Sequence, residues 1–551
     1  MSHVPDIADG GRGRQIVAVA AAGIGQALAT AMAAFATRDL FAALHGTAPP
    51  ERLSLWLLFG GGVLLVVGRI AERGAAEWLG HGYAIALRRA LYRHLARMSV
   101  SAVESRRSGA LGLRFVGDLT AARNWAGLGL TRIVSSSFVI PGAALTLWSL
   151  NPDLAAVTLP PIGGALVVMA LGLLVVERLH RRLRSRRASI ALAMLERVPV
   201  APELDLMGRT DRELARLDRD GASLRRRATI RRLVHTALRN VPEVGAALAA
   251  TLLLASAVSS GAAAADVAAM LAVLGILAVP LRELGGIWDR RCAWRVAHGK
   301  LRNVLETPLA DARGTSVRER RRRREAHGAA RLAGPSLVFR DVGFRGKALD
   351  FALRAGETAS VGGSPGSGKS SLLALAAGLE TPDAGSIERG GDATPEVVFV
   401  RGTSPVLQGS LRRALTLGVS PRPDDATIEA AAERFGLTEP LRRLGGLDGR
   451  VGEGGRTLSS GERLRLHLVR AALAQPELLV LDLPDMADPT LWEDVRHLLL
   501  DNPATVLVSD ARDRLADVVD RRFSMEGGGL VETAADRSTA AARPAIQSRS
   551  S

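Results

Sequence analysis

Residues 358–371 read T-A-S-V-G-G-S-P-G-S-G-K-S-S. The apolar run Thr358–Val361 predicts a strand, the segment after it carries the motif G-x-x-x-x-G-K-S, and a helical pattern extends from Ser371 to Leu379. In this order, glycines let backbone N–H groups close around phosphate oxygens, and the helix N-terminus adds its dipole. The stretch therefore predicts an α/β domain whose nucleotide site is formed by Gly363, Ser364, Pro365, Gly366, Ser367, Gly368, Lys369, Ser370 and Ser371.

A second apolar run, Leu478–Asp482, ends in a carboxylate further along the chain. A strand that ends in aspartate, in a chain that also carries a phosphate-binding loop, is typical of a Mg²⁺ site. We expect Lys369 to reach the β- and γ-phosphates of ATP, and Ser370 and Asp482 to ligate Mg²⁺. Lysine is rare here: Lys300, Lys347 and Lys369 are the three lysines among 72 basic side chains.

Outside this domain the composition indicates a membrane protein. The chain has 551 residues, of which 47% are hydrophobic and 23% charged, with a mean hydropathy of +0.14. That length predicts at least two domains. Long uncharged runs separated by arginine-rich stretches occupy much of residues 15–283. Six of them approach the ~20 residues that cross a bilayer: about 15–37, 53–68, 133–150, 154–176, 240–258 and 264–281.

The connections between these runs differ in length and charge. The second and fourth are long, arginine-rich and helical in composition, whereas the others are short. We expect two helical hairpins on the arginine-rich side, with Leu111–Asp118 and Val198–Gly208 at their tips. Arg12 and Arg14 precede the first run, so the positive-inside rule places the N-terminus in the cytoplasm. The prediction is a multi-pass protein of the cytoplasmic membrane with a cytoplasmic ATP-binding domain.

The net charge of +17 does not indicate a nucleic-acid partner. The arginines flank apolar runs, as expected beside a lipid bilayer, and only 4% of residues are aromatic. The single cysteine, Cys292, rules out an intrachain disulfide and a cysteine-based zinc site, and we expect it to pack as a small hydrophobic residue.

Composition changes suggest five segments. The boundaries are a cytoplasmic N-terminus over 1–14, a six-span membrane domain with two cytoplasmic helical extensions over 15–283, a linker over 284–334, a nucleotide-binding domain over 335–533 and a disordered tail over 534–551.

Between the loop and Asp482 lies Leu458-Ser459-Ser460-Gly461-Glu462, followed by the basic helical segment Arg463–Leu473. Here the sequence resembles the ABC ATPase family, whose signature this matches with Ser460 and Glu462 as mild variants. Six spans with long cytoplasmic hairpins resemble the exporter-type membrane domain. The resemblance implies an all-α six-helix transmembrane domain joined to an α/β P-loop ATPase domain.

In this family two half-transporters pair, and each ATP lies between one P-loop and the partner's signature. The resemblance therefore assigns Leu458, Ser459, Ser460, Gly461 and Glu462 to the partner's site. It also makes the hairpin tips the coupling helices that contact the ATPase domains.

Five positions depart from the family pattern, and all concern the nucleotide or its hydrolysis. After the Mg²⁺-binding aspartate the family places a glutamate that polarises water, but this chain has Leu483, which cannot accept a proton. The family's switch histidine aligns with Asp510, which we expect to present an anion to the γ-phosphate. The glutamine of the Q-loop aligns with Gly402, the D-loop aspartate with Pro489 (Asp488 is one residue early), and the adenine-stacking aromatic with Gly346 (Phe344 is a candidate substitute).

These departures favour a half-transporter that binds ATP at a degenerate site and pairs with a different, intact chain to export an unidentified lipid, drug or peptide. Two alternatives remain open: a homodimer that holds ATP and regulates without transport, and an importer or homodimeric exporter with unusual chemistry. Arg69, Glu72 and Arg73 either mark a functional site at the depth of the inner leaflet or pair with one another along their helix.

Overall fold

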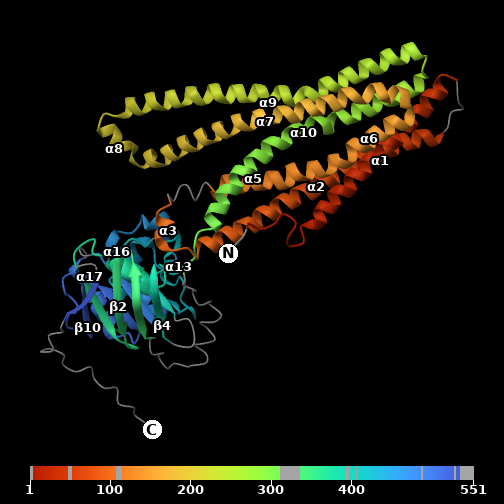
Figure 1. Ribbon diagram of the computed structural model, residues 1–551. Coiled ribbons are helices and arrows are strands. Elements are labelled where there is room, and N and C mark those ends of the chain that lie inside the picture. The colour runs from red at the N-terminus through yellow and green to blue at the C-terminus, as the bar shows by residue number, and fades with distance from the viewer. Residues whose placement is uncertain are drawn as a thin grey trace, which may run out of the picture. The chain divides into compact units, whose positions relative to one another are not determined.

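The computed structural model describes residues 4–46, 52–106, 114–310, 336–390, 396–404, 406–484, 488–526 and 529–533. The chain divides into two compact units (Figure 1). The membrane unit comprises Met1–Ala96 and Glu104–Thr307, and the ATPase unit comprises Arg97–Val103 and Pro308–Ser551. The predicted tail, 534–551, and the linker after residue 310 lie outside the described residues.

The membrane unit is all-helical. Its principal helices are α1 (Gly13–Leu44), α2 (Arg52–Leu95), α6 (Thr131–Leu150), α7 (Pro152–Arg197), α9 (Thr210–Ser260) and α10 (Ala264–Leu305). The start of α6 is extended by the π-helical turns η1 (Arg114–Asp118) and η2 (Trp125–Leu130), which flank α5 (Leu119–Asn124).

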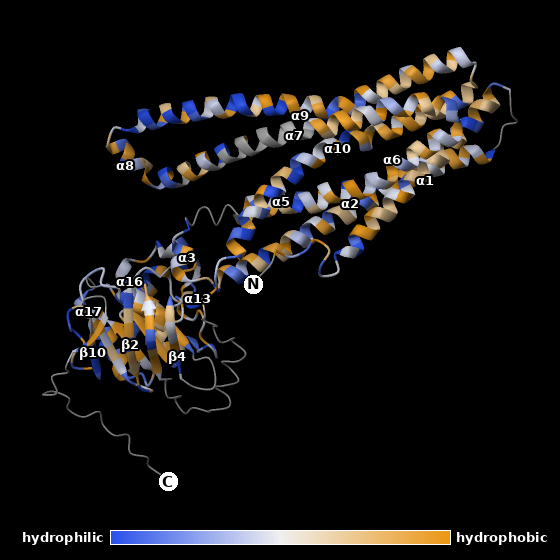
Figure 2. Ribbon diagram, viewed as in Figure 1, coloured by the Kyte–Doolittle hydropathy of each residue, from blue (hydrophilic) through white to orange (hydrophobic). Residues whose placement is uncertain are grey.

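Six helices of the described residues are long and apolar enough to cross a membrane, as the uncharged runs predict. These are Gly13–Leu44, Arg52–Leu95, Phe115–Leu150, Pro152–Gly172, Thr210–Ser260 and Ala264–Leu305. Their hydrophobic segments contrast with the hydrophilic end of α9 nearest α8 (Figure 2).

Small residues let these helices approach closely. A Cβ on Gly61 of α2 would lie 3.1 Å from the Ala29 carbonyl oxygen of α1, and one on Gly23 would lie 3.0 Å from the Ser135 carbonyl oxygen. Because lipid tails are as apolar as leucine, close backbone packing of this kind holds membrane helices together. Helix α1 consequently packs against α2, α6 and α10, and α7 runs beside α9.

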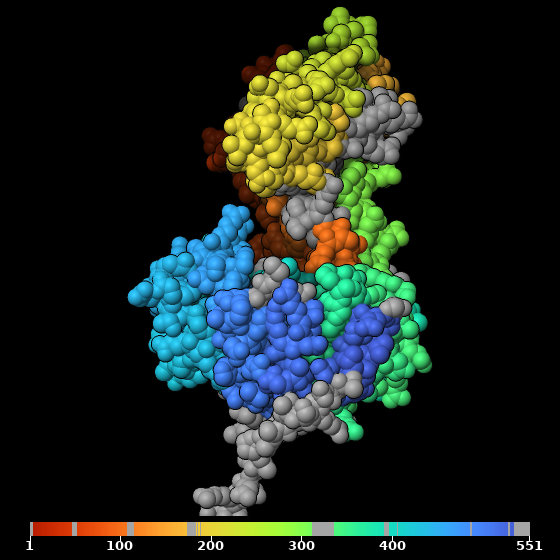
Figure 3. All heavy atoms as spheres, turned by 90° about the vertical axis from the view of Figure 1, so that its left-hand side faces the viewer, coloured from red at the N-terminus to blue at the C-terminus, as the bar shows by residue number. Residues whose placement is uncertain are grey.

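The second hairpin tip is where the sequence predicts it. Between α7 and α9 lie a 3₁₀ turn, η3 (Val198–Val200), and α8 (Ala201–Leu206), within the yellow end of the hairpin that faces the viewer in Figure 3.

The first predicted tip, Leu111–Asp118, lies partly outside the described residues. Arg114–Asp118 already begins the third membrane helix, and residues 111–113 lie outside the described part of the chain. A short helix, α3 (Val100–Glu104), precedes this segment in the chain, and Arg97–Val103 belongs to the ATPase unit. There Glu380 accepts hydrogen bonds from the Ser101 N–H (2.6 Å) and hydroxyl (2.8 Å), so the segment is held by a buried carboxylate.

The segment predicted as the beginning of a linker, 284–305, is also different, because α10 continues through it to Leu305. Its apolar side chains repeat with helical spacing, and Ile287, Cys292, Trp294 and Leu301 are buried. The single cysteine thus packs inside the membrane unit, as expected.

The ATPase unit contains a nine-stranded sheet in the order β4-β1-β2-β11-β10-β3-β9-β8-β5. Its parallel part places β9 (Thr505–Ser509) between β3 (Thr358–Gly362) and β8 (Leu478–Asp482), with β5 (Val397–Arg401) outside β8 and β10 (Arg521–Glu526) outside β3. The remaining strands are β1 (Leu337–Phe344), β2 (Lys347–Leu353), β4 (Ala384–Arg389) and β11 (Gly529–Thr533). Ligands of such sheets bind beyond the carboxyl ends of the parallel strands.

A short two-stranded sheet pairs β6 (Gly409–Ser410) with β7 (Arg450–Val451). The helices of this unit are α12 (Lys369–Ala376), α13 (Leu411–Leu415), α14 (Asp425–Arg434), α15 (Thr438–Leu444), α16 (Ser460–Ala474) and α17 (Pro489–Leu500), with a 3₁₀ turn, η4, at Glu453–Gly455.

Candidate functional site

The glycine-rich loop lies between β3 and α12 and has the conformation that its glycines predict. Gly363, Gly366 and Gly368 have φ values of 125°, 82° and 108°, which side chains rarely adopt. The Lys369 ammonium donates to the carbonyl oxygens of Gly363 (2.6 Å) and Ser364 (3.1 Å). The Ser367 hydroxyl oxygen is buried without a hydrogen-bond partner among the described residues. The loop thus offers an ammonium and an unsatisfied hydroxyl to a phosphate.

The two groups expected to hold Mg²⁺ come together from different elements. Ser370, in the first turn of α12, donates its hydroxyl proton to the Asp482 carboxylate at the end of β8, at 3.1 Å. A hydroxyl and a carboxylate in contact are hard oxygen donors of the kind that Mg²⁺ prefers. This donor pair fits the ion that accompanies ATP.

Leu483 lies in the core. Its side chain is 4% exposed and belongs to the hydrophobic cluster that also contains Leu481 and Val508. Its backbone is tied to β9, because Leu483 N–H donates to the Ser509 oxygen (2.8 Å) and the Ser509 hydroxyl donates to the Leu483 carbonyl (3.2 Å). The position that the resemblance gives to a catalytic glutamate is therefore occupied by a core side chain.

Asp510 does not present an anion to the loop, contrary to the expectation from sequence. Its carboxylate accepts hydrogen bonds from the backbone N–H groups of Arg512 (3.2 Å) and Leu515 (2.8 Å), and the residue is 1% exposed. Burial raises the pKa of this carboxyl, although the two N–H donors oppose the shift. Aspartate readily caps a turn in this way, which sequence alignment does not reveal.

The other divergent positions are likewise accounted for by local structure. Gly402 follows β5 and donates its N–H to the Asp482 carbonyl oxygen at 3.2 Å, and a Cβ there would lie 3.1 Å from Pro484. Asp488 caps α17 through Thr490 N–H, and Pro489 takes the first helical position. Phe344 is not a substitute for the adenine-stacking ring, because it is 6% exposed and packs in the core.

The signature segment begins α16. The Ser459 oxygen accepts from Glu462 N–H (3.2 Å), and the Glu462 carboxylate accepts from Ser459 N–H (2.7 Å), which is a capping box. Arg443 also pairs with Glu462 at 3.0 Å. A hydroxyl that accepts the helix N–H keeps its own proton, so Ser459 can still donate to an anion at this helix N-terminus. Leu458 is buried before the cap, and Gly461 has no heavy atom near its missing Cβ.

A cavity of about 370 Å³ lies within the membrane unit. Its charged lining consists of Arg69, Glu72, Arg73, Arg132, Arg239, Glu283 and Arg290. Five cations thus face two carboxylates in a region reached by α2, α6, α9 and α10.

One interpretation of the sequence paired Glu72 with arginines of its own helix. The structure instead pairs its carboxylate with residues of other helices. The carboxylate accepts from Arg132 (2.7 Å) and from the Gln26 amide (2.7 Å), and Arg132 also pairs with Glu283. Sequence spacing could not identify these partners, which lie on other helices.

These features together define a membrane-embedded P-loop ATPase. The sequence matches the family described as the ABC transporter transmembrane region over residues 16–277 and the ABC transporter family over residues 347–485. The chain belongs to the ABC transporter family, and because it carries both regions it is an exporter-type half-transporter. Members of this type work as dimers in a lipid bilayer.

Individual relatives differ in what they are named for. The chain is 26% identical over 515 residues to an ATP-dependent lipid A-core flippase of Thiobacillus denitrificans, which covers 86% of this chain and 85% of that protein. It is 33% identical over 260 residues to a mycobactin import ATP-binding/permease protein of Mycolicibacterium thermoresistibile, a match that covers 44% of this chain and 43% of that protein. It is 30% identical over 207 residues to the ATP-binding protein of a lipoprotein-releasing system of Nitratidesulfovibrio vulgaris, a match that covers 34% of this chain and 86% of that protein.

Proposed function

We propose that this chain is the degenerate-site subunit of a heterodimeric ATP-driven exporter of the cytoplasmic membrane. Its P-loop binds Mg–ATP as a slowly exchanging clamp, and its signature segment completes the hydrolytic site of a partner chain whose own motifs are intact. The observation that carries this proposal is the burial of Leu483 in the core, where the family places its water-activating glutamate.

The chemistry supports an asymmetric division of labour. Loss of a general base typically slows a reaction by about 10²–10⁴-fold, and Asp510 offers no replacement because its carboxylate caps a backbone turn. By contrast, the groups suited to phosphate and metal are retained: Lys369 donates to the Gly363 carbonyl of the loop, and Ser370 donates to the Asp482 carboxylate. A site with these groups retains affinity for the nucleotide while losing turnover.

ATP hydrolysis tests the proposal. It is measured for this chain alone and for this chain co-expressed with the ABC half-transporter encoded nearest to it. We expect no ATP turnover by the chain alone and measurable ATP turnover by the co-expressed pair. In the pair, Ser459→Ala in this chain is expected to abolish turnover, whereas Lys369→Ala only weakens it. Robust turnover by the chain alone would refute the degenerate site, and silence in both preparations would favour the regulatory alternative.

The membrane cavity supports a proposal for the substrate, namely an amphiphile with an anionic head group. The cations around the cavity outnumber the carboxylates by five to two, and Arg132 is the one held by both Glu72 and Glu283. Arginine suits phosphate because its planar guanidinium donates two parallel hydrogen bonds. The flippase relatives, named for lipid A-core, agree with this chemistry.

Stimulated ATPase activity of the pair tests this second proposal. Vesicles containing lipid A are expected to stimulate turnover several-fold more than vesicles of phosphatidylcholine alone, and Arg69→Gln or Arg239→Gln to remove the difference. Arg302→Gln is the matched control, because Arg302 pairs with Glu306 outside the cavity lining. Equal stimulation by both vesicles would exclude an anionic head group.

The direction of transport needs its own measurement, because the mycobactin relative unites both regions in one chain and is named for import. Inside-out vesicles that accumulate substrate on addition of ATP would establish export. Accumulation in right-side-out vesicles loaded with ATP would establish import.

A further inference from the structure

The hairpin at the mouth of the nucleotide site is too tight to carry an adenine-stacking ring. Phe344 of β1 pairs directly with Lys347 of β2, which leaves only Arg345 and Gly346 in the turn. Both turn residues have positive φ values, 49° and 77°, as a two-residue hairpin with matching twist requires. The Phe344 ring points into the core. No aromatic side chain therefore projects from this described turn toward the loop.

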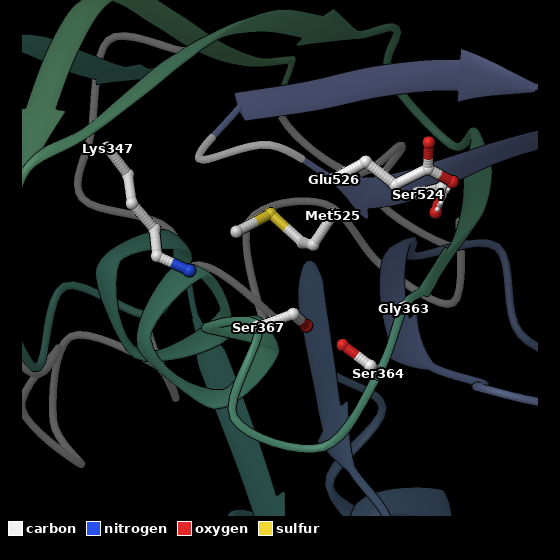
Figure 4. Close-up of a pocket in the computed structure, with 7 residues that line it drawn as sticks. All are labelled: Lys347, Gly363, Ser364, Ser367, Ser524, Met525 and Glu526. Carbon is white, nitrogen blue, oxygen red and sulfur yellow. Dashed lines mark hydrogen bonds between the residues drawn. The ribbon is translucent and has the colours of Figure 1, made fainter.

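Lys347 reaches the loop instead. Its ammonium nitrogen lies 2.5 Å from where a Cβ on Gly368 would be, which places the ammonium directly against the loop. Lys347 also lines a pocket of about 480 Å³ with Gly363, Ser364 and Ser367 of the loop (Figure 4). Two of the chain's three lysines, Lys347 and Lys369, thus serve the same phosphate-binding loop.

The rest of the pocket comes from β10. Met525 forms an apolar wall, and the Glu526 carboxylate lies across the pocket from Lys347 (Figure 4), where it accepts from the Ser524 hydroxyl at 2.9 Å. The lysine side of the pocket is therefore the side on which a phosphate chain is electrostatically favoured.

We propose that Lys347 binds the phosphate chain of the bound nucleotide and replaces the adenine-stacking aromatic as the second anchor of this site. The inference rests on the proposed binding of nucleotide at the P-loop. Stacking recognises the flat face of a base, whereas an ammonium paired with phosphate recognises charge. The ligand class is thus a Mg–triphosphate, with the base contributing little.

Competition against a fluorescent ATP analogue, with the full-length chain in detergent and Mg²⁺ present, tests this inference. The competitors are ATP, GTP and inorganic triphosphate. We expect ATP and GTP to bind within about threefold of each other and triphosphate within about tenfold of ATP, because the charged contacts dominate. Lys347→Met is expected to weaken all three by about tenfold, the size of one charge-assisted hydrogen bond.

Lys300→Met is the matched control, because it removes the lysine that lies in the membrane unit. A second measurement does not depend on that comparison: added NaCl is expected to weaken binding more steeply in the unmodified chain than in Lys347→Met. ATP binding more than about 30-fold tighter than that of GTP and triphosphate would overturn the inference alone. So would a Lys347→Met variant that matches the control. Failure of all three ligands to bind would overturn the proposed function as well.

Discussion

Acidification is expected to destabilise the ATPase unit through a single buried histidine of α16. His467 is 5% exposed, and its Nε2–H donates to the Ser404 carbonyl oxygen at 3.2 Å. Burial, helped by the charge of Arg470, lowers the pKa of His467 from 6.5 to about 4. The unfolded chain therefore binds this proton more tightly than the folded chain, so stability is complete above pH 6.5 and falls between pH 6.5 and pH 4.

The magnitude follows from the size of the shift. At about 1.4 kcal/mol per pKa unit, the full loss is about 3 kcal/mol, and about 2 kcal/mol of it is reached by pH 5. His467→Gln keeps an N–H donor for Ser404 but does not titrate, so its stability should depend much less on pH. Hydrogen exchange of peptides from α16, corrected for intrinsic rates between pH 7 and pH 5, measures the effect in the full-length chain.

His497→Gln is the control, because His497 lies on the exposed face of α17 in the same unit. The unmodified chain and this control should lose protection together as the pH falls. If His467→Gln shows the same pH dependence as the other two, the reasoning from burial is refuted.

Three further substitutions address the site and its supports. Leu483→Glu buries a carboxylate in the core and is expected to cost about 3 kcal/mol or more of stability. The Tm should fall and ATP turnover should not be restored. A stable, active variant would contradict the structure. Glu380→Ala removes both acceptors of Ser101 and should lower the local stability of residues 97–103 by about 2 kcal/mol. Their amide hydrogens should exchange at least tenfold faster than in the control variant Glu388→Ala, which changes an exposed glutamate. Glu72→Gln leaves Arg132 with Glu283 as its carboxylate partner and is expected to lower stability in detergent by about 1–2 kcal/mol; an unchanged Tm would show that the Glu72–Arg132 pair contributes nothing.

The elements around the phosphate loop were predictable because their signals are local. Glycines at 363, 366 and 368, an apolar strand before them and a capped helix after Ser459 each depend on neighbours in sequence. The partners of Glu72 and Glu380 were not predictable, since Arg132 and Ser101 lie far away in the chain. The short helix α3 was not predicted either, because its five residues are too few for a periodic pattern.

Three side chains that differ from the family pattern, Leu483, Asp510 and Glu462, each stabilise the fold locally. Leu483 fills the core, Asp510 caps a turn and Glu462 closes the capping box of α16 while pairing with Arg443. If the proposed degenerate site is correct, restoring one catalytic residue at a time must remove a structural interaction before the chemistry is complete. Single reversions should therefore lower stability without raising turnover. Recovery of hydrolysis should require Leu483→Glu together with Asp510→His, and a new cap for the turn at Leu515.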